Sequence, residues 1–196
     1  LGDNTVTITG DVTLTDEAAV TNDANGALAF ALGGAQGITV AGNPTTDPTL
    51  SNIRVNNAST VTLNSNIFLS GDLALNNGDF VVGGADVTLT MTGTDARITR
   101  DPFNGDLTVN GTLAGSWDVT YFGAGGSSTD EFADGQTVDV TVNMTDGQTL
   151  DLNDNGTASG NLYVQDGLVD VSADVEFEGN FTNHADLDDF QVTGSL

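Results

Sequence analysis

The chain repeats one pattern, in which short runs of aliphatic residues alternating with Thr or Asp are each followed by Gly, Asn or Asp. Alternation with a period of two is typical of a β-strand that has one buried face and one solvent-facing face. Gly, Asn and Asp favour turns, so we expect turns between the runs. The pattern therefore predicts an all-β protein. The clearest runs are Thr5–Thr15, Ser59–Asn66, Gly71–Gly78, Ala85–Gly93, Asp106–Gly111, Thr137–Gly147 and Leu168–Gly179.

The spacing of these runs indicates how the strands are arranged. Most runs are short, their turn residues are Asn, Asp and Gly more than Pro, and apolar pairs recur loosely at about 18–24 residues, as expected when each coil adds one rung to a stack. We therefore predict a parallel β-helix, or β-solenoid. An antiparallel β-sandwich is the alternative, because short strands separated by turns are typical of that fold as well.

The length of 196 residues suits one all-β domain, and no stretch has the length or composition of an interdomain linker. We therefore expect a single domain over residues 1–196. Two segments interrupt the alternation. Residues 42–52 contain Pro44 and Pro48 and are expected to form a protruding loop, and the Gly- and Ser-rich residues 123–135 are expected to form a second surface loop.

The charge of the chain limits the classes of molecule that it can bind. The formal net charge is −25, the 28 acidic residues include only four Glu, and Lys is absent. A field this negative repels nucleic acid and anionic membranes, while it favours solubility, cation binding and tolerance of salt. The use of Asp without Lys resembles the surface composition of proteins from extreme halophiles. A secreted acidic protein from a moderate or marine habitat is the other interpretation.

Several kinds of chemistry lack the residues that they need. Cys is absent, which excludes disulfides, thiolate metal sites and Cys nucleophiles. His184 is the only histidine and no G-x-S-x-G turn occurs, so we find no credible Ser-His-acid triad. The absence of Lys also argues against the proton abstraction of a β-helical polysaccharide lyase. We therefore expect a protein that is not an enzyme.

The segment Asn66–Gly93, with the sequence NIFLSGDLALNNGDFVVGGADVTLTMTG, resembles the repeat units of large bacterial or archaeal adhesin-type surface proteins that contain parallel β-helix regions. The resemblance covers under a fifth of the chain. It implies a secreted or surface-displayed rod used for adhesion or structural extension. It carries no catalytic residues over to this chain.

Together these features predict a non-enzymatic, extracellular structural or adhesive protein, adapted to salt. It would be a subunit or segment of a cell-surface filament, appendage or long adhesin, either self-associating or continuing in a longer chain, with surface glycans as further partners. A carbohydrate-binding module or viral fibre domain is the alternative. Leu1 is not a start Met and no signal peptide is visible, so we expect a processed product or an excised segment. We expect no membrane insertion, because the longest apolar stretch is far too short to span a bilayer.

The sequence DLNDNGTAS begins like a calcium loop. Asp151, Asn153 and Asn155 occupy positions 1, 3 and 5, and Gly156 occupies position 6. Position 12 is Leu162 instead of Glu, which excludes an EF-hand but leaves either a looser Ca²⁺ turn or a plain turn between strands. A second polar group near the C-terminal end is either a transition-metal site or a solvated turn. It comprises His184, Asp186, Asp188 and Asp189.

Two further sets of residues are candidates for surface roles. Trp117 and Tyr121 share one face of SWDVTYF, where they form either an exposed strip that stacks on sugar rings or part of the core. Five N-x-S/T sequons would be exposed glycosylation sites in a host that has N-glycosylation. Their acceptor residues are Asn57, Asn110, Asn143, Asn155 and Asn180.

Overall fold

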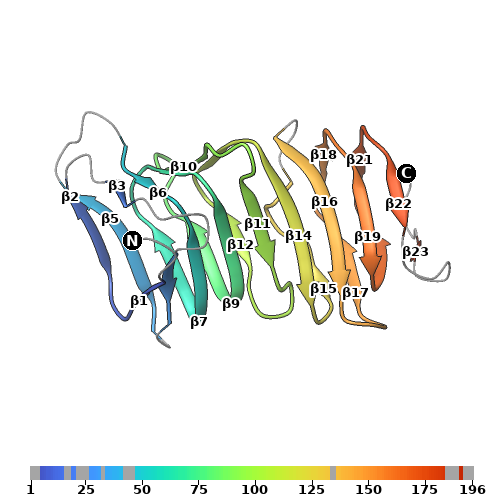
Figure 1. The fold of residues 1–196 in the computed structure, drawn as a ribbon, viewed down its shortest axis with the longest axis horizontal. Helices are drawn as coiled ribbons and strands as arrows, with labels where there is room; N and C mark the ends of the chain where they lie inside the picture. The colour runs from blue at the N-terminus through green and yellow to red at the C-terminus, as the bar shows by residue number, and fades with distance from the viewer. Residues whose placement is uncertain are drawn as a thin grey trace. The chain divides into compact units, whose positions relative to one another are not determined.

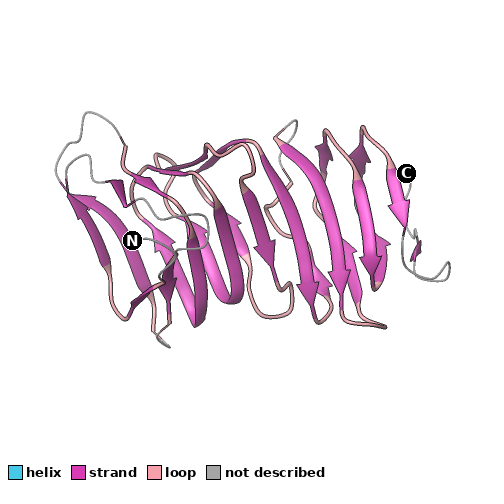
Figure 2. Ribbon diagram, in the orientation of Figure 1, coloured by secondary structure: helices cyan, strands magenta, loops and turns pink. Residues whose placement is uncertain are grey.

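The structure is a computed structural model that describes residues 5–15, 19–20, 27–31, 34–41, 47–132, 136–183 and 190–191. Every regular element in this part of the chain is a β-strand, as Figure 2 shows, and none is a helix. No helix that is long and apolar enough to cross a membrane occurs in these ranges. The chain divides into two compact units, residues 1–96 with 104–115 and residues 97–103 with 116–196, which are described separately. The expectation of a single domain stays a prediction.

Strands of the first unit form two parallel ladders (Figure 1). In the first ladder the order is β1–β4–β7–β9–β12, and β2 pairs with β5, which pairs with β7. The order in the second ladder is β3–β6–β8–β10–β13. The long strands β7 and β9 lie side by side, with Ile53 opposite Leu73. The strands are β1 (Val6–Ile8), β2 (Val12–Thr15), β3 (Ala19–Val20), β4 (Leu28–Phe30), β5 (Gln36–Ala41), β6 (Thr49–Leu50), β7 (Ile53–Leu63), β8 (Ile67–Leu69), β9 (Asp72–Val82), β10 (Thr88–Met91), β12 (Leu107–Val109) and β13 (Thr112–Gly115).

The second unit repeats this arrangement. One ladder runs β11–β14–β16–β18–β21, with β19 and β22 continuing from β16, and the other runs β15–β17–β20–β23. All of these pairs are parallel. The strands are β11 (Arg97–Arg100), β14 (Trp117–Gly123), β15 (Gly126–Ser127), β16 (Thr137–Met144), β17 (Thr149–Leu152), β18 (Gly156–Ala158), β19 (Leu162–Asp166), β20 (Leu168–Val171), β21 (Val175–Phe177), β22 (Phe181–Asn183) and β23 (Phe190–Gln191).

Parallel pairing between successive coils confirms the predicted β-solenoid and excludes the antiparallel sandwich. The alternating pattern explains why the chain folds this way. Inward-facing residues stack in columns through the coils, as Ile98, Val119, Val140 and Leu162 do in the second unit, where each is at most 3% exposed. Aliphatic side chains stacked in register bury apolar surface between every pair of neighbouring coils, which drives the stacking.

Both segments predicted as loops take part in the stack. Of residues 42–52, Gly42–Thr46 lies outside the described residues, but Thr49–Leu50 forms β6 between β3 and β8, and Leu50 is fully buried. In the segment 123–135, Gly126–Ser127 forms β15, and Glu131 is completely buried. These parts of the two segments are therefore paired or buried, and the expectation that the segments protrude stays a prediction for the remainder.

Candidate functional site

Polar side chains at the corners of the coils bond to the next coil. Asp118 Oδ1 accepts a hydrogen bond from the backbone N–H of Asp139 at 3.1 Å, and Asp139 Oδ1 accepts from the N–H of Asn161 at 2.6 Å and from its Nδ2 at 2.9 Å. Asn161 Oδ1 then accepts from the N–H of Asn180 at 2.9 Å. We call the column Asp118–Asp139–Asn161–Asn180 the acceptor ladder.

The same bond recurs in both units. In each case an Asp or Asn side-chain oxygen accepts the backbone N–H of a residue 19 to 27 positions later, which is one coil along the stack. Asp118 lies where the pairing of β14 and β16 shifts register, and Asp11, Asn52, Asn66 and Asn155 each precede a strand, so a short side chain accepts a backbone N–H where the ladder begins or is interrupted. The further pairs are Asp11 with Gly37, Asn52 with Asp72, Asn66 with Thr88, Asp79 with Asp106 and Asn155 with Asp174.

The three residues of the predicted calcium turn each accept a hydrogen bond through a side-chain oxygen. Asp151 Oδ1 accepts from Ser172 Oγ at 2.6 Å, Asn153 Oδ1 from Ser128 Oγ at 3.3 Å and Asn155 Oδ1 from the Asp174 N–H at 3.0 Å. Each oxygen thus bonds to a neighbouring coil, and the calcium site stays a prediction.

Within the described ranges, no group of three or more His, Cys, Asp or Glu side chains is placed to hold a metal ion. The second candidate metal group, with His184, Asp186, Asp188 and Asp189, lies outside those ranges.

Of the two interpretations of Trp117 and Tyr121, an exposed strip or part of the core, the structure has the second. Trp117 is 1% exposed and Tyr121 is fully buried, so neither ring can stack on a ligand at the surface. Both contact Glu131, which is also fully buried: Trp117 Nε1 donates to the Glu131 carbonyl at 3.1 Å, and the Tyr121 hydroxyl donates to Glu131 Oε2 at 3.3 Å. Burial, reinforced by the negative charge of Glu131, raises the pKa of Tyr121 above its ordinary value.

Glu131 organises a buried polar cluster that the sequence analysis missed. Its carboxylate forms an ion pair with Arg100 of β11, and both side chains are completely buried. Thr129 completes the cluster, since its N–H donates to Glu131 Oε2 at 2.6 Å and its Oγ1 accepts from Arg100 at 3.0 Å. The hydroxyl of Thr137 donates to the Glu131 carbonyl at 2.9 Å. These bonds fix the segment before β16 in the core.

Asp154 lies beside this cluster on the turn that precedes β18. Its Oδ2 is buried and finds no hydrogen-bond partner among the residues described. Burial raises the pKa of Asp154 to about 6, and the carboxylates of Asp130 and Glu131 add to the shift. The folded protein therefore binds this proton more tightly than the unfolded chain does.

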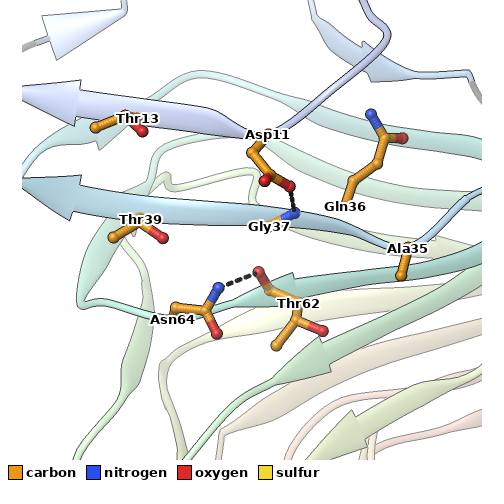
Figure 3. Close-up of a pocket in the computed structure, with 8 residues that line it drawn as sticks. All are labelled: Asp11, Thr13, Ala35, Gln36, Gly37, Thr39, Thr62 and Asn64. Atoms are coloured by element: carbon orange, nitrogen blue, oxygen red, sulfur yellow. Dashed lines mark hydrogen bonds between the residues drawn. The ribbon is translucent and has the colours of Figure 1, made fainter.

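A polar depression of about 450 Å³ lies on the outer face of the first unit, over strands β2, β5 and β7 (Figure 3). At its centre is Gly37, which has no side chain, so the Asn64 amide can approach to 2.9 Å from the place that a Cβ would take. The Gly37 N–H donates to Asp11 Oδ1 at 2.7 Å. Thr13 and Thr39 lie opposite each other on neighbouring strands. The lining is completed by Ala35, Gln36, Thr62 and Asn64.

Four of the five sequon asparagines have exposed side chains, namely Asn110, Asn143, Asn155 and Asn180. Asn155 and Asn180 use their side-chain amides in bonds to neighbouring coils. Asn57 lies in β7, and its side chain is outside the described part of the chain. Glycosylation at these positions stays a prediction.

Comparisons with known proteins give no relative from which the role of these residues can be inferred. No family model matches the chain, and no curated protein and no solved structure matches it significantly.

We expect Glu131→Gln to lower the free energy of unfolding by about 3–5 kcal/mol, because it leaves the Arg100 charge buried without a counter-charge. The double variant Arg100→Met/Glu131→Gln removes both charges and should recover much of this loss. Urea unfolding followed by Trp117 fluorescence measures both. A single variant no less stable than the double variant would show that the ion pair does not hold this segment.

The raised pKa of Asp154 predicts a dependence of stability on pH. Its contribution is complete below its ordinary value of 3.8 and is lost as the pH rises through about 6, so the protein should lose stability between about pH 4 and about pH 6. Asp154→Asn should remove this part of the slope, whereas Asp95→Asn, at an exposed turn position, should leave it. Melting temperatures across this range test the prediction, which fails if wild type and Asp154→Asn change in parallel.

Proposed function

We propose that this chain is a non-enzymatic, extracellular structural or adhesive protein, a subunit or segment of a cell-surface filament, appendage or long adhesin. The observation that carries the proposal is the set of Asp and Asn acceptors that bond each coil to the next. Asp139 alone accepts two hydrogen bonds from Asn161 of the following coil. Polar side chains used in this way stabilise a rigid stack of coils, which is what a load-bearing or spacing element requires.

The interactions that stabilise the fold are compatible with an extracellular location. The chain has no Cys, so its coils are held by hydrogen bonds and by apolar columns. Neither depends on the redox state of the surroundings. Self-association or continuation in a longer chain would extend the same parallel pairing, since a coil at the end of a stack presents strand edges to any further coil.

The negative charge supports adaptation to salt. A net charge of −25 on 196 residues causes self-repulsion, which dissolved ions screen. Packing of several such chains in a filament would increase the repulsion, so assembly should depend on ionic strength or on divalent cations that bridge carboxylates.

A carbohydrate-binding module is the second candidate. The buried positions of Trp117 and Tyr121 remove the aromatic surface that suggested it. The depression over Gly37 is a separate observation that favours contact with a ligand of this kind, and it is compatible with an adhesive role.

The proposal predicts ordered assemblies in purified protein imaged by electron microscopy across NaCl and CaCl₂ series. Regular filaments should form at high salt or with calcium, because both relieve repulsion between chains. A NaCl sample matched to the ionic strength of each CaCl₂ sample separates the effect of screening from that of calcium binding. A chelator should weaken the filaments formed with CaCl₂ and leave those formed in NaCl unchanged. Monodisperse single chains under every condition would contradict a self-assembling filament subunit.

A further inference from the structure

We infer that the depression over Gly37 is a binding subsite for a neutral sugar unit of a surface glycan. This inference deepens the adhesive part of the proposed function and rests on it. The depression exists because Ala35, just before β5, and Gly37 and Thr39 of β5 face outward between two segments whose outward side chains are larger and polar. Figure 3 shows Asp11, just before β2, and Thr13 of β2 on one side, and Thr62 and Asn64 of the β7 segment on the other.

The lining excludes other classes of ligand. None of the eight lining residues is basic, and the chain carries a net charge of −25, so anions such as phosphates or acidic sugars are repelled. The only carboxylate is that of Asp11, and its Oδ1 already accepts the Gly37 N–H, which is too little for a cation that takes six to eight oxygens. Ala35 is the only apolar side chain, so a hydrophobic ligand would gain little by burial.

A neutral polyol is the class that these groups match. The hydroxyls of Thr13, Thr39 and Thr62 each donate and accept, the amide of Asn64 does both, and the Asp11 carboxylate accepts. Sugar hydroxyls also donate and accept, so a ring held over Gly37 can satisfy several of these groups at once. The volume of about 450 Å³ is within the range of small-molecule sites.

The site is held in place before any ligand arrives. Gln36 points inward and donates from Nε2 to the Gly10 carbonyl at 2.9 Å, which fixes the turn that carries Asp11. On the other side the Asn64 N–H donates to the Ile38 carbonyl at 2.8 Å. Because the walls are strands of a hydrogen-bonded stack, binding costs little reorganisation. The depression is open, so we expect one site to bind its sugar weakly. Display of many copies of the protein on one surface would raise the overall avidity.

The test is a titration of ¹⁵N-labelled protein with neutral disaccharides of glucose, galactose, mannose and N-acetylglucosamine, followed by NMR. At least one of them should shift the amide signals of Gly37 and Thr39 and the side-chain amide of Asn64 in a saturable manner. Sialyllactose and CaCl₂ serve as the anionic and cationic probes. The inference is wrong if none of the neutral disaccharides shifts these signals. It is equally wrong if sialyllactose or CaCl₂ shifts them while the neutral disaccharides do not.

Two variants and one control assign the effect to the depression. Gly37→Val fills it and should abolish the shifts. The added Cβ lies 2.9 Å from Asn64 Nδ2, the end of an exposed side chain that can move, so the strand should still fold. Thr39→Val removes one hydroxyl at nearly constant shape and should weaken binding about five- to tenfold, the factor that one hydrogen bond contributes. Ala74→Val adds bulk at an outward position of β9 away from the depression and should bind as wild type.

The outcomes separate this inference from the proposed function. Unchanged binding by Gly37→Val, with its fold verified by circular dichroism, would overturn the sugar subsite. Filaments that form normally in a protein that binds no neutral sugar would overturn the subsite alone and leave the structural role. Sugar binding by a protein that never assembles would support the subsite and count against the filament.

Discussion

Hydrogen bonding from each coil to the next is the constraint on which the structure depends. In a parallel stack the backbone groups of the strands find their partners in the neighbouring coils. Strand pairing meets this need along the faces, and the Asp and Asn side chains meet it where the ladder begins or is interrupted. Asp139 shows how far the arrangement goes, because it receives two bonds from Asn161 while its own N–H donates to Asp118.

Much of the fold follows from the sequence for the same reason. Period-two alternation in LALNNGDFVV places Leu73 and Leu75 on the buried face of β9, and after a change of phase at Asn77–Gly78 it places Phe80 and Val82 there. The structure has all four fully buried. Asn and Asp at the ends of several runs mark turns, as Asn64 does after β7, whereas Asn76 and Asn77 lie within β9. Side chains at several of these turns also bond to the next coil, which a turn pattern alone does not reveal, because the partner lies 19 to 27 residues away.

The sequence analysis failed where a charged residue lies in the core. Residues 123–135 have the Gly and Ser content of a surface loop, yet Glu131 is buried because Arg100, 31 residues earlier, needs a counter-charge. A signal was present: in RITR the alternation places Arg100 on the same face as buried Ile98. Trp117 and Tyr121 follow the same rule, sharing a face with buried Val119. For the depression there was no local signal, because it needs Gly37 between Asp11 and Thr62 of two other strands.

The central claim is that side-chain acceptors hold successive coils together, and hydrogen exchange of the Asn161 amide tests it most directly. Asp139→Asn keeps an oxygen that accepts this N–H, whereas Asp139→Ala removes it. We predict that Asp139→Ala lowers the free energy of opening at Asn161 by about 1–3 kcal/mol and that Asp139→Asn retains most of it. Equal protection of Asn161 in wild type and Asp139→Ala would contradict the account.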